Sequence, residues 1–345
     1  MEWVELGVAL VVILISAELF TNGVEWIGEN LGLSEGAVGS VLAAVGTALP
    51  ETILPLVAIL LGHASGEEIG IGAILGAPFM LSTLAMFVLG VSVLWFARGG
   101  RRSTDVRGDR TVILQDLGYF LVMYTLALVA GLFHPKWFKW LLAALLLVGY
   151  AIYVRRHFQA PGEKVEEAEA SGEVKPLYLM RWARRLRGEA AGNPAQPPTS
   201  ASIAQSILAL LGIILGARVF VLGIDRIADT FHVPPLALAL LIAPIATELP
   251  EKFNSVIWVR RKKDTLALGN VTGAMVFQSS FPVMVGLLLT PWRLTGDALV
   301  AAIVALVAGA VLWLTVKIRG ALGAHLLLAQ GALFAGYTVY VLVRI

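Results

Sequence analysis

Hydrophobic positions along the chain gather in long runs, separated by short polar or charged segments. A helix that crosses the hydrocarbon core of a bilayer needs about 20 mostly apolar residues. Runs of that length predict ten membrane-spanning helices, and the longer ones are expected to tilt or to break at internal proline and glycine. The predicted spans are residues 3–22, 37–61, 69–96, 111–132, 137–155, 202–222, 234–259, 265–290, 296–317 and 321–343.

Composition agrees with a chain surrounded by lipid. Mean hydropathy is +0.81 and only 14% of residues are charged, whereas a soluble protein has about 25%. The chain has no cysteine, which excludes disulfides, thiolate metal sites and thiol catalysis. A net charge of +2 gives no reason to expect a nucleic-acid partner. Acidic Glu2 and Glu5 stand where a cleavable signal would be basic, so the first span is predicted to be retained.

Basic residues predict the orientation of the spans. Arginine and lysine concentrate after the third, fifth, seventh and ninth spans, and such loops face the cytoplasm. Residues 156–200 are therefore predicted to form a cytoplasmic loop, with both termini outside, in the cell (inner) membrane of a prokaryote. Within the loop, the basic segment 180–188 is either a short helix on the membrane surface or a solvated stretch.

An internal repeat divides the chain. Residues 17–51 align without a gap with residues 217–251, at an offset of 200. A second block, 72–82, matches 269–279 at an offset of 197. Each half holds five predicted spans, and an odd number makes the halves insert in opposite directions. The predicted organisation is an all-α polytopic membrane protein with a first five-helix repeat at 1–155, the loop at 156–200 and a second, inverted repeat at 201–345.

A proline–glutamate pair occurs at the same place in both repeats. Pro50 and Pro250 are expected to break or kink their helices, which would free backbone carbonyls. Glu51 and Glu251 are expected to face each other near the middle of the membrane, where secondary transporters built from inverted repeats bind their substrates.

Neighbouring side chains extend this candidate site. Thr47 and Thr247 lie one helical turn before the glutamates, and Glu248 shares the side of Glu251. Oxygen ligands of this kind suit hard cations. One carboxylate at mid-membrane costs at least about 2.5–3.5 kcal/mol, and several repel one another, so a cation or protons must reside among them. Lys252 either snorkels away in a structural role or neutralises a carboxylate.

These motifs resemble the calcium/cation antiporter superfamily, and its sodium/calcium exchanger branch most of all. The matching segments are GTALPE (46–51), GAILGAPFML (72–81), ATELPE (246–251) and GNVTGAMVFQ (269–278). The resemblance implies ten spans in two inverted five-helix repeats. It also implies that Glu51 and Glu251 are the acidic calcium ligands, that Thr47 and Thr247 serve calcium and sodium, and that Gln278 occupies a position of the metal site.

Several positions depart from the family pattern. Small polar residues that serve sodium in the family are replaced here by Ala48, Glu248, Ala77, Ala274, Leu81 and Gln278. Glu248 adds an acid that can carry a proton instead. The resemblance thus leaves the choice between sodium and proton as counter-ion open.

The function predicted from the sequence is secondary active antiport of a hard divalent cation, Ca²⁺ first, against Na⁺ or H⁺. The first and sixth spans would slide or rock against the core, helped by Gly23 and Gly223. No prosthetic group is expected, and the partners are inorganic cations and lipid. Two alternatives stay open: a family member that binds or senses ions without transport, and an intramembrane enzyme with paired glutamates, which the lack of DDxxD and HExxH motifs disfavours.

Overall fold

The computed structural model of the chain describes residues 2–31, 43–62, 64–100, 102–133, 135–159, 175–186, 196–294 and 296–344. The side chains of residues 43–49, 157–159, 185–186 and 249–251 lie outside this description.

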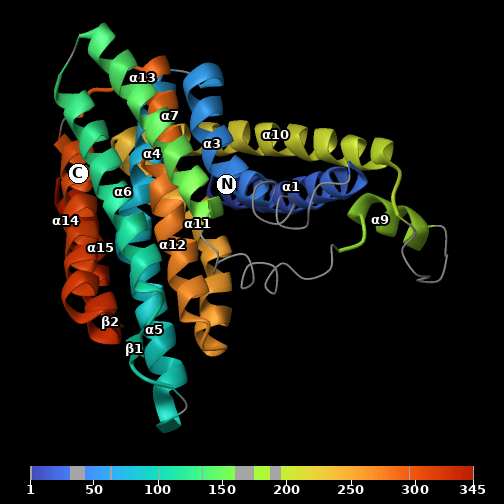
Figure 1. Cartoon of the computed structure of the whole chain (residues 1–345). Helices are drawn as coiled ribbons and strands as arrows, with labels where there is room; N and C mark the ends of the chain where they lie inside the picture. The colour runs from blue at the N-terminus through green and yellow to red at the C-terminus, as the bar shows by residue number, and fades with distance from the viewer. Residues whose placement is uncertain are drawn as a thin grey trace.

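The described chain is nearly all helical (Figure 1). Its elements are α1 (Glu2–Asn30), α3 (Ala43–Leu61), α4 (Gly66–Met80), η2 (Leu81–Ala85), α5 (Met86–Ala97), η3 (Arg98–Gly100), β1 (Asp105–Val106), α6 (Arg110–Leu132), α7 (Lys136–Gln159), α9 (Tyr178–Leu186), α10 (Thr199–Phe231), α11 (Pro235–Arg260), α12 (Asp264–Gln278), α13 (Phe281–Leu289), α14 (Gly296–Arg319), β2 (Leu322–Gly323) and α15 (Ala324–Val343).

Of the described helical segments, eight are long and apolar enough to cross a membrane. They correspond to the predicted spans one, three to six and eight to ten. The other two predicted spans fall on α3 and α11, whose apolar stretches are shorter, at Pro50–Leu61 and Pro235–Glu248. These are the helices that carry the proline–glutamate pairs, and their apolar stretches are bounded by residues 43–49 and 249–251, whose side chains lie outside the description. The count of ten spans stays a prediction.

The sequence predicts that Pro50 and Pro250 break or kink their helices; a break is wrong at both places, and a kink stays a prediction. Helix α3 continues through Pro50, and α11 runs from Pro235 to Arg260 without interruption. A proline removes one backbone donor, but breaking the helix would expose several more polar groups where water is scarce. The helical pattern changes instead in the following span of each half. In the first half, α4 passes into the π-helix η2, and in the second, Ser279 and Ser280 separate α12 from α13.

Hydroxyl groups stabilise both interruptions. In the first half, Thr83 Oγ1 donates a hydrogen bond to the Phe79 carbonyl at 2.5 Å. In the second half, Ser280 Oγ donates to the Val276 carbonyl at 2.7 Å. Phe79 and Val276 are equivalent at the offset of 197, so the same solution recurs at matching positions. Serine and threonine commonly satisfy backbone carbonyls that an irregular membrane helix leaves without a helical donor.

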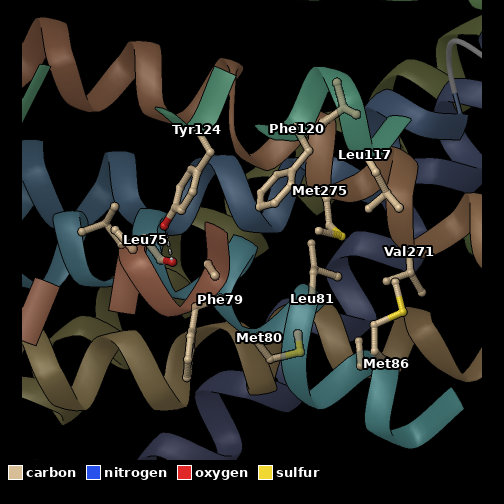
Figure 2. Close-up of a cluster of buried hydrophobic side chains, with 14 of the residues drawn as sticks. Leu75, Phe79, Met80, Leu81, Met86, Leu117, Phe120, Tyr124, Val271 and Met275 are labelled. Carbon is tan, nitrogen blue, oxygen red and sulfur yellow. Dashed lines mark hydrogen bonds between the residues drawn. The ribbon is translucent and has the colours of Figure 1, made fainter. Parts of the chain in front are cut away.

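The larger buried hydrophobic cluster joins α4 to α7 with α11 to α15. Figure 2 shows part of it: Leu75 of α4 lies beside Tyr124 of α6, and Met275 of α12 lies near Phe120 of α6 and Leu81 of η2. The Tyr124 hydroxyl is buried there and donates to the Leu75 carbonyl at 3.2 Å. Because the ring is apolar and its single polar atom is bonded, tyrosine fits this core at little cost.

Helices α1 and α10 belong to a second cluster, together with α3 and parts of α4 and α11. They lie side by side and run across the direction of the remaining helices (Figure 1). Gly23 of α1 packs against Ser206 of α10, and Gly223 of α10 packs against Leu6 of α1. Each residue of one contact is 200 positions from its counterpart in the other. A twofold axis that relates the two halves would exchange one of these contacts with the other. The packing of α1 against α10 therefore agrees with such an axis.

Three of the basic loops share one face of the molecule. Strand β1, after the third span, pairs antiparallel with β2, after the ninth. Arg102 forms an ion pair with Asp264, which follows the seventh span, at 2.9 Å between Nη2 and Oδ1. Arg110 also donates to the Lys317 carbonyl at 2.6 Å. These contacts confirm that the loops lie together, as the distribution of basic residues predicts.

The described part of the central loop is docked on α1 and α10. The basic segment forms a helix, α9, whose first residues bond to buried amides. The Tyr178 N–H donates to Asn22 Oδ1 at 3.2 Å, and the Leu179 N–H donates to Gln205 Oε1 at 2.8 Å. The Asn22 side chain donates in turn to the Lys175 carbonyl at 2.9 Å. We call residues 175–179 the docking segment.

An ion pair fixes the start of the docking segment. Lys175 Nζ lies 3.0 Å from Glu18 Oε1, and the Tyr178 hydroxyl donates to the same oxygen at 2.7 Å. The hydrogen bond to Glu18 raises the pKa of Lys175. The lysine therefore keeps its charge, and this anchor persists, through the neutral pH range.

Asn22→Leu is expected to destabilise the protein by about 1–3 kcal/mol, because Gln205 Nε2 and the Tyr178 N–H lose a buried acceptor. The measurement is thermal unfolding in detergent, where Tm should fall. Gln196→Ala is the control, since it removes only an exposed hydrogen bond to Asn30 and should leave Tm nearly unchanged. Equal Tm values for Asn22→Leu and the parent protein would contradict the structural role of this amide.

Candidate functional site

A small cavity lies where α3 and α4 of the first half meet α11 of the second half. Its volume is about 10 Å³, which is room for one water molecule or a single dehydrated cation. The polar residues in its wall are Glu51 of α3 and Thr247 of α11. The apolar part of the wall consists of Leu54, Pro55, Ala73, Ala77, Ala243 and Pro244.

Two glycines of α4 determine how closely the cavity walls approach. A Cβ atom at Gly72 would meet the Leu236 carbonyl of α11, and one at Gly76 would meet the Leu240 carbonyl. The two glycines have the G-x-x-x-G spacing that lets membrane helices pack closely. At the equivalent Gly269, no described atom lies within 4 Å of such a Cβ.

Glu51 and Thr247 supply oxygen atoms to the cavity. Glu51 is 6% exposed and Thr247 is 4% exposed. The Thr247 hydroxyl donates to the Ala243 carbonyl at 3.1 Å, so its lone pairs remain available to a positive ion. A carboxylate and a hydroxyl are ligands that hard cations prefer.

Glu248 lies on the same turn of α11 and forms a buried network. Its Oε1 accepts a hydrogen bond from Gln278 Nε2 at 2.5 Å, and its Oε2 lies 3.6 Å from Lys252 Nζ. Lys252 also donates to the Asn270 carbonyl at 3.3 Å. Of the two roles considered for Lys252, the structure supports pairing with a carboxylate, since the side chain points inward and is 4% exposed.

The structure thus joins the predicted site residues in two groups. Glu51 and Thr247 share the cavity, and Glu248 bonds to Gln278. The side chains of Thr47 and Glu251 lie outside the described part of the chain, so the facing of Glu51 and Glu251 stays a prediction. Within the described residues, no three acidic or histidine side chains come together as a metal cluster.

Asp116 is a buried acid that the sequence analysis missed. It lies on α6, is 1% exposed, and accepts hydrogen bonds from the Tyr153 hydroxyl at 2.9 Å and from Thr272 Oγ1 at 2.6 Å. The predicted acidic ligands all come from the repeated motifs, and Asp116 stands outside them. Its position as a lone aspartate within a predicted span could have identified it from the sequence, because such acids are costly in a membrane and mark functional or structural sites.

The family model described as "Sodium/calcium exchanger protein" matches residues 1–158 and 201–345. The chain belongs to this family. The match covers both predicted repeats and leaves out the central loop. It confirms the resemblance to the calcium/cation antiporters that the two proline–glutamate motifs suggest, and it makes the chain a membrane transport protein of the exchanger type.

A curated relative and two solved structures illustrate the family. The chain is 25% identical over 293 residues to the putative antiporter CaxA of Alkalimonas amylolytica, covering 82% of this chain and 79% of that protein. The crystal structure of the H⁺/Ca²⁺ exchanger CAX has a TM-score of 0.70 at 16% identity, over 98% of this chain and 82% of that one. The sodium-calcium exchanger NCX_Mj has a TM-score of 0.53 at 22% identity, over 98% of each chain. These structures establish the exchanger fold.

Family membership also bears on the alternatives. The exchanger family and its structural neighbours are transporters rather than enzymes, which disfavours an intramembrane enzyme with paired glutamates. The identity of the ions and the role of each glutamate are not decided by family membership.

Gly76→Ala is expected to destabilise the protein by about 1–3 kcal/mol, because the added methyl group overpacks against the Leu240 carbonyl and Pro244. Gly7→Ala is the matched control: Gly7 is also helical, but a Cβ there has no described atom within 4 Å, so the change should be neutral or slightly stabilising. Thermal unfolding of both variants in detergent makes the comparison. Equal Tm values for the two variants would show that α4 and α11 are not held by this contact.

Proposed function

We propose that the protein is a secondary active antiporter that exchanges a hard divalent cation, Ca²⁺ above all, for Na⁺ or H⁺. The observation that carries this proposal is the shared cavity of Glu51 and Thr247, since each residue comes from the repeated motif of a different half. An acid buried among apolar residues requires a compensating positive charge or a proton. A site that alternates between a divalent cation and monovalent ones meets that requirement at every stage of a cycle.

The proposed cation ligands are Glu51, Glu251, Thr47 and Thr247, with Glu248 and Gln278 beside them. All of these side chains offer oxygen, which favours calcium over metals that prefer sulfur or imidazole. The similar solved structures are an H⁺/Ca²⁺ exchanger and a sodium-calcium exchanger. Their substrates support calcium as the transported ion and leave sodium or proton as the counter-ion.

The proposed architecture is ten spans in two inverted repeats, residues 1–155 and 201–345. Two structural features support it: the interchangeable contacts of Gly23 with Ser206 and Gly223 with Leu6, and the interruptions at equivalent positions of the third and eighth spans. Inverted repeats allow a transporter to present one site to either side by exchanging the conformations of its halves. Helices α1 and α10 form the moving pair in this proposal, since they pack outside the larger cluster.

The proposed orientation places the shared face of the basic loops in the cytoplasm. Positively charged loops remain on that side during insertion, and the loops after the third, seventh and ninth spans contact one another. The central loop 156–200 would lie there too, with both termini outside the cell membrane. No protein partner or nucleic acid enters the proposed cycle.

Purified protein in liposomes tests the function. Calcium uptake is measured separately under an imposed sodium gradient and an imposed pH gradient, and uptake should follow one of the two. Glu51→Gln or Glu251→Gln should reduce uptake at least tenfold, because the remaining ligands no longer balance a divalent charge. Glu67→Gln is the control, since Glu67 is an exposed residue at the start of α4.

The possible outcomes separate the proposals. Uptake that survives both Glu51→Gln and Glu251→Gln would defeat the assignment of the site. Calcium binding to the wild-type protein without uptake under either gradient would defeat antiport and favour an ion-binding sensor.

A further inference from the structure

A buried lysine lies beside the candidate site. Lys252 lies one helical turn after Glu248 on α11, and their side chains are 4% and 2% exposed. A charge is tolerated at such a place only when it is paired and hydrogen-bonded. The ammonium group lies 3.6 Å from Glu248 Oε2 and 3.3 Å from the Asn270 carbonyl. These two oxygens are the kind of ligands that a free monovalent cation would select.

The first repeat lacks this pair. At the offset of 200, Glu248 corresponds to Ala48 and Lys252 corresponds to Thr52. The second repeat has thus gained one acid and one base together, which leaves the total charge of the region unchanged. Gln278 holds the other oxygen of Glu248 at 2.5 Å. Its position on α12 fixes the carboxylate against the ammonium, so that the pair is built into the contact between α11 and α12.

We propose that the Lys252 ammonium is a built-in monovalent cation of the transport site, which lowers by one the number of monovalent ions exchanged for each divalent ion. The inference rests on the proposed antiport function and adds its stoichiometry. The three glutamates of the two motifs and the one lysine give the site a net charge of −2. One divalent cation neutralises that charge, and two monovalent cations neutralise it on return. The cycle therefore moves no net charge across the membrane.

This prediction can be measured as the response of calcium accumulation to membrane potential. A cycle that moves one net charge changes the equilibrium calcium ratio about 50-fold for 100 mV. In liposomes whose potential is set with potassium and valinomycin, the wild-type calcium ratio should not respond to potential. Omitting valinomycin under the same ion gradients separates the effect of potential from any effect of potassium itself.

Variants that change the charge of the site in opposite directions should give opposite responses of calcium accumulation to membrane potential. Lys252→Gln leaves a net charge of −3, so a third monovalent ion returns for each calcium ion and accumulation should depend on potential. Glu248→Gln leaves −1, so one monovalent ion returns and the dependence should have the opposite sign. The double variant, with both changes, restores −2 and should again be insensitive. Lys252→Arg keeps the charge and serves as the conservative control.

The outcomes distinguish this inference from the proposed function. Absence of calcium uptake by the wild-type protein under any gradient would defeat antiport itself. Wild-type uptake that responds to potential would overturn the assignment of Lys252 as a built-in cation, but it would leave the proposal of antiport intact. If Lys252→Gln fails to fold, Glu248→Gln and the double variant still decide: equal responses to potential in both would overturn the inference, whereas a response only in Glu248→Gln would support it.

Discussion

Charge placed in a medium that cannot solvate it is the constraint on which the rest of this structure depends. Glu51, Glu248 and Asp116 are all buried on helices of this membrane protein, and each needs compensation from its surroundings. The chain meets the need differently at each place. Asp116 receives two hydroxyl hydrogen bonds, Glu248 receives an amide and an ammonium, and Glu51 borders a cavity. Only the last arrangement leaves space for an ion from outside the protein.

The surrounding helices are packed to keep these groups in position. Gly72 and Gly76 let α4 approach the backbone of α11, and this contact forms a wall of the cavity. The interruptions after α4 and α12 are stabilised by hydroxyls of the same segments, so the irregular backbone does not require water. Close to the site, glycines and hydroxyl side chains thus take the place of large apolar side chains in the contacts between helices.

Hydropathy alone located eight of the ten predicted spans, because the length of an apolar run indicates whether a helix can cross the bilayer. The repeat offset of 200 likewise relates two helix contacts to each other, because it converts the contact of Gly23 with Ser206 into that of Gly223 with Leu6. Proline chemistry wrongly predicted helix breaks at Pro50 and Pro250, because a local rule neglected the cost of exposing neighbouring backbone groups in a membrane. The partner of Lys252 depended on side-chain direction, and Asp116 on contacts between distant helices, which a linear pattern does not contain.

The docking segment has a consequence for how α1 and α10 can be displaced. Asn22 of one helix and Gln205 of the other bond to each other and to different backbone groups of the docking segment. Sliding one helix along the other would strip both amides of their partners at once, in a region with little water to replace them. We therefore expect the two helices to be displaced together relative to the bundle, with the docking segment attached to both.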